Sequence, residues 1–208
     1  MLNRRQFSLL ASVGLPSAAV LGGSLLPAVA WADTADAAAA FIEKLLRDLS
    51  AVVNSGKSVP DQQVALREII FARVDVDSVA RFCLGRFWRT ATPQQQKDYT
   101  EIFRNVMVSN ITGKVGEYQG VSFTVGKAQM REDDVTVASI VNRPGNAPNK
   151  VDWLVATTSG SPKVVDVIAE GTSLRLTQRG DNTAFLARNN NDVQALIDAM
   201  KKQTTAAN

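Results

Sequence analysis

Apolar positions in the first half of the chain, after about residue 35, recur with the period of a helix. Within residues 36–54, Phe41, Leu45, Leu49 and Val52 follow one another at intervals of four, four and three, which places them along one side of a helix. Similar apolar patterns predict three further helices, which run from Pro60, from about Asp75 to Phe87, and from Pro93 to about Lys114. This half of the chain is therefore expected to be helical.

Residues at two of the expected helix ends support this interpretation. Gly56 follows the first helix and suits a left-handed C-terminal cap. Thr92 precedes Pro93, which fits the first helical position, and Gln95 stands three residues after Thr92. This spacing predicts a capping box at the start of the fourth helix.

The period changes after about residue 120. Four segments rich in Val, Ile and Thr are separated by turn residues and predict strands at 121–129, 135–143, 151–158 and 163–169. Short connections between them favour an antiparallel meander. Helical patterns return over 172–189 and 191–202, and the tail at 203–208 is expected to be disordered. The predicted fold class is α+β, with a four-stranded, mainly antiparallel sheet packed on a helical layer in one domain of residues 33–202.

The first 32 residues read as an export signal and are excluded from the fold. Arg4 and Arg5 are followed by an uncharged stretch from Ser8 to Val29, and residues 30–32 fit the small-x-small rule for cleavage. The paired arginines are typical of twin-arginine signals but also occur in ordinary secretory signals. We therefore expect an exported protein with a cleaved N-terminal signal.

Charge and cysteine content exclude several classes of protein. Arg4 and Arg5 belong to the signal, so of 23 basic residues 21 remain, against 20 acidic residues, and the mature chain carries a net charge of +1. Nucleic-acid binding normally needs a basic excess, and strong attraction to anionic membranes does as well. Cys83 is the single cysteine, cannot form an internal disulfide, and is expected to be a buried small apolar residue.

The chain contains no histidine, which removes the commonest acid–base catalyst and the commonest metal ligand. Two groups of carboxylates remain. Asp75 and Asp77 have the spacing of a helix N-terminus, and residues 132–134 resemble a solvated hairpin turn. No glycine-rich phosphate loop is present in the sequence. We expect neither an enzyme nor a metal or cofactor site.

Several short segments, in a fixed order, resemble one known family. They are Leu84-Gly85, Trp88, Gln94-Gln95-Gln96, Asp166-Val167 and Glu170-Gly171-Thr172-Ser173-Leu174. Together they are similar to the periplasmic lipid carriers that include MlaC, the phospholipid-binding component of the Mla pathway, and the toluene-tolerance proteins. The resemblance extends from about residue 41 to residue 201.

The large apolar side chains of the helical half have two explanations, an ordinary core or the wall of a cavity. The resemblance implies the second, with acyl chains held between the sheet and the helices. The candidate lipid-binding residues are then aromatic or aliphatic side chains from both layers: Phe82, Trp88, Phe103 and Met107 on helices, Tyr118 at the rim, and Phe123, Trp153, Val155, Val167 and Ile168 on strands.

The resemblance also implies a function and its partners. It implies a carrier that shuttles a phospholipid between the outer and inner membranes, served by an inner-membrane ABC transporter complex and an outer-membrane lipoprotein complex. Some relatives are associated with hopanoids, so a hopanoid carrier is an alternative. A ligand-free periplasmic adaptor with a filled core is another.

Two further groups of residues lie in these segments. Gly85 and Gly171 are interpreted as backbone positions that only glycine suits. Arg81, Arg86 and Arg89 either place positive charge near a lipid phosphate or form a solvated helix face.

Overall fold

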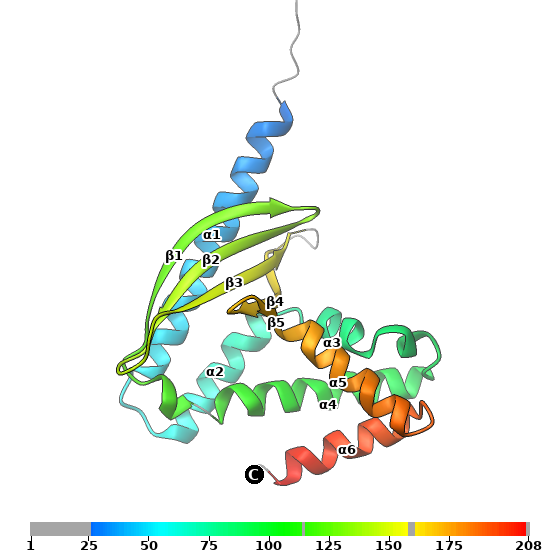
Figure 1. Cartoon of the computed structure of the whole chain (residues 1–208). Coiled ribbons are helices and arrows are strands. Elements are labelled where there is room, and N and C mark those ends of the chain that lie inside the picture. Colours follow the sequence, from blue (N-terminus) through cyan, green and yellow to red (C-terminus); the bar gives the residue numbers. More distant parts are fainter. Residues whose placement is uncertain (1–25, 114, 158–160, 207–208) are drawn as a thin grey trace, which may run out of the picture.

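The computed structural model describes residues 26–113, 115–157 and 161–206 (Figure 1). The helices are α1 (Leu26–Val53), α2 (Val59–Arg73), α3 (Val76–Leu84), α4 (Pro93–Thr112), α5 (Leu174–Arg188) and α6 (Val193–Ala206), with short 3₁₀ helices η1 (Gly85–Arg89) and η2 (Val115–Tyr118). The strands are β1 (Ser122–Arg131), β2 (Asp134–Asn142), β3 (Asn149–Ala156), β4 (Lys163–Ala169) and β5 (Thr172–Ser173). The predicted α+β class is confirmed.

The ends of the chain fall partly outside this description. Residues 1–25 of the expected export signal and residues 207–208 of the expected tail lie outside the described residues. Residues 26–32 belong to the first turns of α1, and α6 continues to Ala206, beyond the end expected near residue 202. In the part of the chain that the structure describes, no helix combines the length and apolar character needed to span a bilayer.

The sheet has five strands in the order β1-β2-β3-β4-β5, and every neighbouring pair is antiparallel. The prediction of four strands was therefore wrong. Glu170 and Gly171 both have positive φ, 49° and 80°, which turns the chain back within two residues. Thr172 then pairs with Ala169 as the start of β5, and the following helix begins at Leu174 rather than at residue 172.

One face of the sheet carries the apolar side chains. The register places Val137 opposite Trp153, and Trp153 opposite Val167, so these side chains point to the same face. The strands bend around α1 (Figure 1), with register shifts in β1 and between β3 and β4. The middle of α1 covers part of this face, where Ala38, Ile42, Leu45 and Leu46 pack on Val135, Val137, Val155 and Val164.

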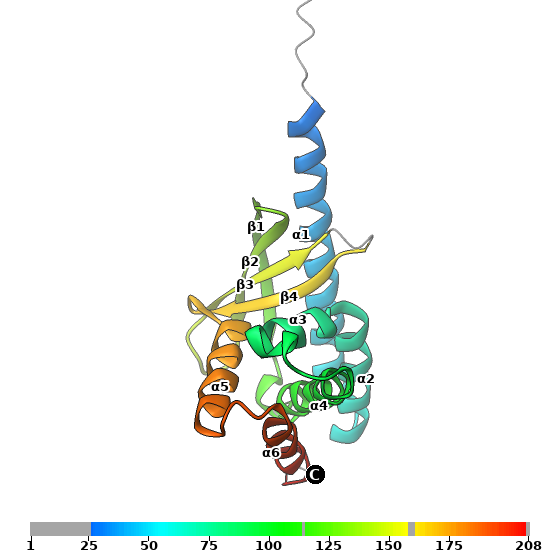
Figure 2. The same ribbon diagram turned by 90° about the vertical axis from the view of Figure 1, so that its right-hand side faces the viewer.

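A second core lies among α3, α4, α5 and α6, below the sheet in both Figure 1 and Figure 2. Its largest fully buried side chain is Tyr99, whose hydroxyl accepts a hydrogen bond of 2.8 Å from the Asn182 amide, so that this buried polar atom is satisfied. The Thr92–Gln95 capping box is confirmed at the start of α4. The third helix, expected to reach Phe87, ends at Leu84 because Gly85 has φ +60° and ψ −130°.

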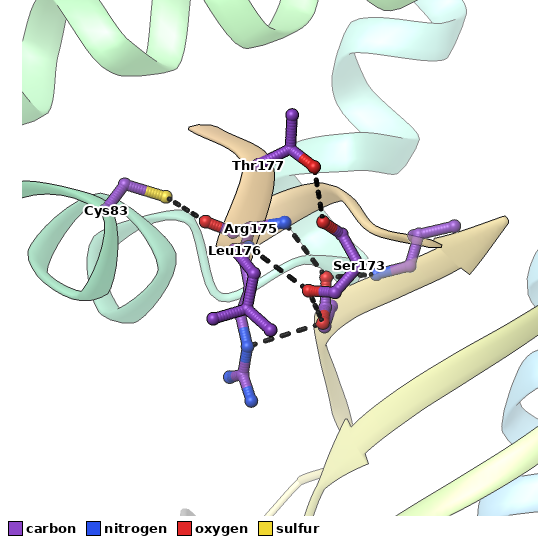
Figure 3. Close-up of polar contacts among 7 residues, drawn as sticks. Cys83, Ser173, Arg175, Leu176 and Thr177 are labelled. Atoms are coloured by element: carbon purple, nitrogen blue, oxygen red, sulfur yellow. Dashed lines mark hydrogen bonds and ion pairs between the residues drawn. The ribbon is translucent and has the colours of Figure 1, made fainter. Parts of the chain in front are cut away.

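The start of α5 joins the two layers (Figure 3). Asp166 on β4 is 7% exposed, and its carboxylate accepts hydrogen bonds from the Ser173 hydroxyl at 2.6 Å and the Arg175 backbone N–H at 3.1 Å. The Ser173 hydroxyl oxygen in turn accepts from the Leu176 N–H at 3.1 Å, which caps the helix. The Cys83 thiol of α3 donates to the Arg175 carbonyl at 3.5 Å. This network fixes α5 between β4 and α3.

Candidate functional site

A cavity of about 930 Å³ lies between the helices and the part of the sheet face that the middle turns of α1 leave uncovered. Its sheet wall is formed by the apolar side chains of Phe123, Val141, Val151, Trp153, Val167 and Ala169, with Asn149 at the start of β3. These residues come from four adjacent strands and share one face because their positions are paired across the sheet. The sheet therefore presents a continuous apolar surface to the cavity.

Among the aromatic and aliphatic side chains of this wall, Trp153 carries the one polar atom, and that atom is bonded within the sheet. Its indole N–H donates to the Ser139 hydroxyl at 2.9 Å, and the Ser139 hydroxyl donates to the Val151 carbonyl at 2.9 Å. Because both groups are satisfied, the ring offers hydrocarbon to the cavity without an unpaired donor.

The inner end of the cavity is closed by buried side chains from α1, α2, η2 and the residue before β1. Val53 at the end of α1 and Leu66 of α2 pack with Val115 and Val121, each 6% exposed or less. All four, together with Leu46 and Leu49 of α1, line the cavity. A ligand in this region would meet only aliphatic side chains, which favours apolar groups over polar ones.

The mouth of the cavity is marked by exposed residues. Ile111 of α4 is 43% exposed and Leu174 of α5 is 52% exposed, although both are large apolar side chains that line the cavity. Arg143 and Glu170 are the charged residues of the lining. The Arg143 guanidinium lies 5.6 Å from the ring centre of Tyr118.

The two charged residues at the mouth differ in their partners. Glu170 already accepts a hydrogen bond of 2.6 Å from the Lys150 backbone N–H. Arg143 contacts the ring of Tyr118, and none of the described carboxylates forms an ion pair with Arg143. The mouth therefore offers a guanidinium that lies over the Tyr118 ring and has no carboxylate partner among the described residues.

The structure brings some of the candidate residues together and separates others. Tyr118, Phe123, Trp153 and Val167 line the cavity. Val155 shares their face but is fully buried against α1, and Ile168 points to the opposite face of β4, because it follows Val167 in the strand. The helical candidates are part of, or pack against, the core of the helical layer and lie outside the lining: Phe82, Trp88, Phe103 and Met107.

For Phe103 and Met107 the reason for this separation is the course of α4. Its first turns pack on α3 and α6, and only its last residues, from Ser109 to Gly113, reach the cavity. The lining residues of α1 were not predicted from the sequence, although Leu49 belonged to the predicted apolar stripe. Val141 and Ala169 were not predicted either, although their alternation with strand neighbours was a usable signal. The lining thus has more signal in the sequence than the prediction used.

The carboxylates interpreted as structural have structural partners. The Asp75 carboxylate accepts from the Ser78 N–H at 3.0 Å and caps α3. Asp77 forms an ion pair of 2.7 Å with Arg104. Residues 132–133 form the turn between β1 and β2, and partial burial raises the pKa of Asp134 next to them.

A family model described as MlaC protein matches residues 40–202 of the chain. The chain belongs to the MlaC family. Toluene tolerance protein ttg2D from Pseudomonas putida is 28% identical over 169 residues, covering 79% of this chain and 78% of that protein. The resemblance drawn from the sequence is thereby confirmed.

A solved structure related to the MlaC-family fold of this chain is the phospholipid-binding protein from Ralstonia solanacearum, determined in complex with a phospholipid. The TM-score is 0.73 at 21% sequence identity, and the match covers 82% of this chain and 98% of that chain. This similarity supports the same fold. The described part of this MlaC-family chain contains no cluster of three or more residues that could hold a metal ion.

Proposed function

We propose that this protein is a periplasmic carrier that holds the acyl chains of a phospholipid in the cavity between α1 and the sheet. The apolar wall and closed inner end of the cavity carry the proposal, because hydrocarbon chains need an apolar space with few polar atoms. A volume of about 930 Å³ is near the upper end of the usual range for ligand pockets. Membership of the MlaC family and the phospholipid bound to the structural relative support the choice of ligand.

The energetics explain the need for a carrier. Each buried methylene contributes about 0.8 kcal/mol, so two sixteen-carbon chains in water would cost on the order of 25 kcal/mol. A lipid therefore crosses an aqueous compartment only if a protein supplies a comparable apolar environment. Such a protein needs no reactive group, since its task is binding and release rather than catalysis.

The head of the lipid is assigned to the mouth of the cavity. Arg143 has no carboxylate partner there and lies beside Tyr118, so a lipid phosphate would receive hydrogen bonds from a guanidinium and from a phenol hydroxyl. The exposed Ile111 and Leu174 would cover the upper part of the acyl chains. The other polar side chains of the lining are Ser109, Asn110, Asn149 and Glu170, and Glu170 already accepts a hydrogen bond from the Lys150 backbone N–H.

The carrier is proposed to shuttle its lipid between the outer and inner membranes after export across the inner membrane. Its partners in this proposal are an inner-membrane ABC transporter complex and an outer-membrane lipoprotein complex, and family membership supports both. The candidate site residues retained in the proposal are those that line the cavity: Tyr118, Phe123, Trp153 and Val167.

The direct test is native mass spectrometry of the mature protein, purified from the periplasm without detergent. We expect an added mass that corresponds to one diacyl phospholipid. An added mass that corresponds to a hopanoid would identify the alternative ligand instead of a phospholipid. A protein that carries no lipid, both as purified and after incubation with phospholipid vesicles, would contradict the proposal and favour the adaptor.

A further inference from the structure

A second hollow, distinct from the cavity, gathers arginines on the side of the molecule where α3, η1 and α5 meet. It has a volume of about 440 Å³. Its lining includes Ser78, Arg81, Phe82, Trp88, Arg89 and Arg179, and we call it the arginine pocket. Arg89 also lines a neighbouring hollow together with Arg86.

These arginines have no carboxylate partners among the described residues. Arg81, Arg86, Arg89 and Arg179 are exposed, and none of them forms an ion pair. The nearby Arg175 does form one, with the buried Asp166 at 3.4 Å. Neither hollow has an acidic residue in its lining. The near-zero net charge of the chain as a whole therefore hides a local excess of positive charge.

Aromatic rings hold several of the guanidinium groups in place. Arg81 lies 5.8 Å from the ring centre of Trp88, and Arg179 lies 5.0 Å from that of Phe82. Arg179 also packs against Gly85, where an added Cβ would lie 3.0 Å from its Nε atom. The glycine that ends α3 thus leaves room for the guanidinium. Groups held in this way lose little freedom when they bind an anion.

We propose that the arginine pocket binds the phosphate of a headgroup at the surface of an anionic phospholipid bilayer, and so docks the protein on the membrane with which it exchanges lipid. Guanidinium groups match phosphate oxygens in geometry as well as charge, and Ser78 adds a hydroxyl donor. A hollow of about 440 Å³ fits one small headgroup. Half-buried Trp88 is of the residue type that favours the membrane interface.

The position of α5 relates this pocket to the cavity. Leu174 in its first turn lines the mouth of the cavity, and Arg179, little more than one turn later, lines the arginine pocket. Leu176, which is 58% exposed, lies between them in the sequence. Docking through α5 would therefore bring the mouth close to the bilayer. This step rests on the proposed function, because a docked mouth matters only to a protein that carries lipid.

The test compares the mature protein with R81Q/R89Q in sedimentation with vesicles of phosphatidylcholine alone and of phosphatidylcholine mixed with phosphatidylglycerol. We expect R81Q/R89Q to bind the anionic vesicles about 30-fold more weakly, since each basic residue near such a surface contributes about a fivefold factor. Binding by the unaltered protein should weaken as salt is added. The matched control is R67Q/R131Q, which removes the same charge from exposed positions outside both hollows and should bind like the unaltered protein.

Several results would overturn the proposal. One is equal binding of the anionic vesicles by all three proteins, and another is no preference of the unaltered protein for anionic vesicles. Inorganic phosphate that shifts the NMR signals of Arg81 and Arg89 in a protein that ignores vesicles would assign the pocket to a soluble anion instead. If R81Q/R89Q lost lipid transfer to the membrane complexes but bound vesicles unchanged, the arginine pocket would be assigned to an acidic protein partner.

The bound lipid of the same samples separates this proposal from the proposed function. R81Q/R89Q should keep its lipid in native mass spectrometry, because neither arginine lines the cavity. Lipid-loaded protein that ignores anionic vesicles contradicts the arginine pocket alone. Protein without lipid contradicts the carrier function, whatever the vesicles show. R89Q alone separates an effect of charge from an effect on folding. Arg89 has no ring contact or ion pair in the described structure, so its substitution removes charge without removing such a contact.

Discussion

Individual side chains in this fold differ in how far their neighbours change their chemistry. The Cys83 thiol is fully buried between α3 and α5, and its hydrogen bond goes to the Arg175 carbonyl. Burial, followed by the nearby Asp166 carboxylate, raises the pKa of Cys83 to about 12. Both effects disfavour the thiolate, which is the reactive form of cysteine.

We expect Cys83 to resist alkylation by iodoacetamide in the native protein at pH 8, because the thiol stays protonated well below a pKa of about 12. The same reagent should label the cysteine fully once urea has unfolded the chain. Mass spectrometry of the two samples measures this. Complete labelling of the native protein within minutes would show that the thiol is accessible and that α3 and α5 separate readily.

Two glycines of the helical layer differ in kind, since Gly85 ends a helix and Gly180 lies inside one. Gly85 ends α3 with a φ of +60° and a ψ of −130°, in a region that other residues rarely occupy, and its missing Cβ leaves room for Arg179. Gly180 lies within α5 with ordinary helical geometry and no neighbouring atom within 4 Å of an added Cβ. The same substitution should therefore have opposite effects at the two positions.

We expect Gly85→Ala to lower the free energy of unfolding by about 1–3 kcal/mol, since the backbone would be strained. Gly180→Ala should raise it by up to about 1 kcal/mol, because alanine favours the helix and restricts the unfolded chain. Urea unfolding followed by circular dichroism measures both. If Gly85→Ala proved as stable as the original protein, the bend that leads from α3 into η1 would not need its positive φ.

These helix ends also show how much of the fold follows from local sequence. The capping box at Thr92 was predicted, and Gly171 was recognised as a position that suits glycine, because both signals involve neighbouring residues only. The strand β5 was missed, since a two-residue strand has no period to detect and exists only through its pairing with β4. The end of α3 at Leu84 was also missed, although Gly85 had been recognised as a special position.

The whole molecule consists of two packed regions with a space beside the sheet. The middle of α1 covers one part of the apolar sheet face and the cavity lies against another part. Val151 lines the cavity, whereas Lys150 is the preceding residue of the same strand, is exposed, and points to the opposite face. A large side chain at Val151 would fill the cavity, and the same side chain at Lys150 would test for effects on β3 that do not involve the cavity.

We expect Val151→Trp to reduce the amount of co-purified phospholipid several-fold, because the larger ring would occupy space that the acyl chains need. Lys150→Trp is the matched control and should keep the original lipid content. Lipid extracted from equal amounts of folded protein provides the measurement. Equal lipid content in the two variants would place the ligand elsewhere and remove Val151 from the proposed site.

Local and alternating patterns in the chain were enough to predict the helices, the four longer strands and the α+β class, since these depend on the spacing of apolar residues and on short-range caps. The ordered motifs were enough to indicate the MlaC family. The composition of the cavity wall depended on packing between distant segments. Phe103 and Met107 are as apolar as Phe123 and Trp153, but their positions on α4 direct them toward the helical core instead of the cavity. Hydrophobicity shows that a side chain will be buried, while only the arrangement of the elements determines what it is buried against.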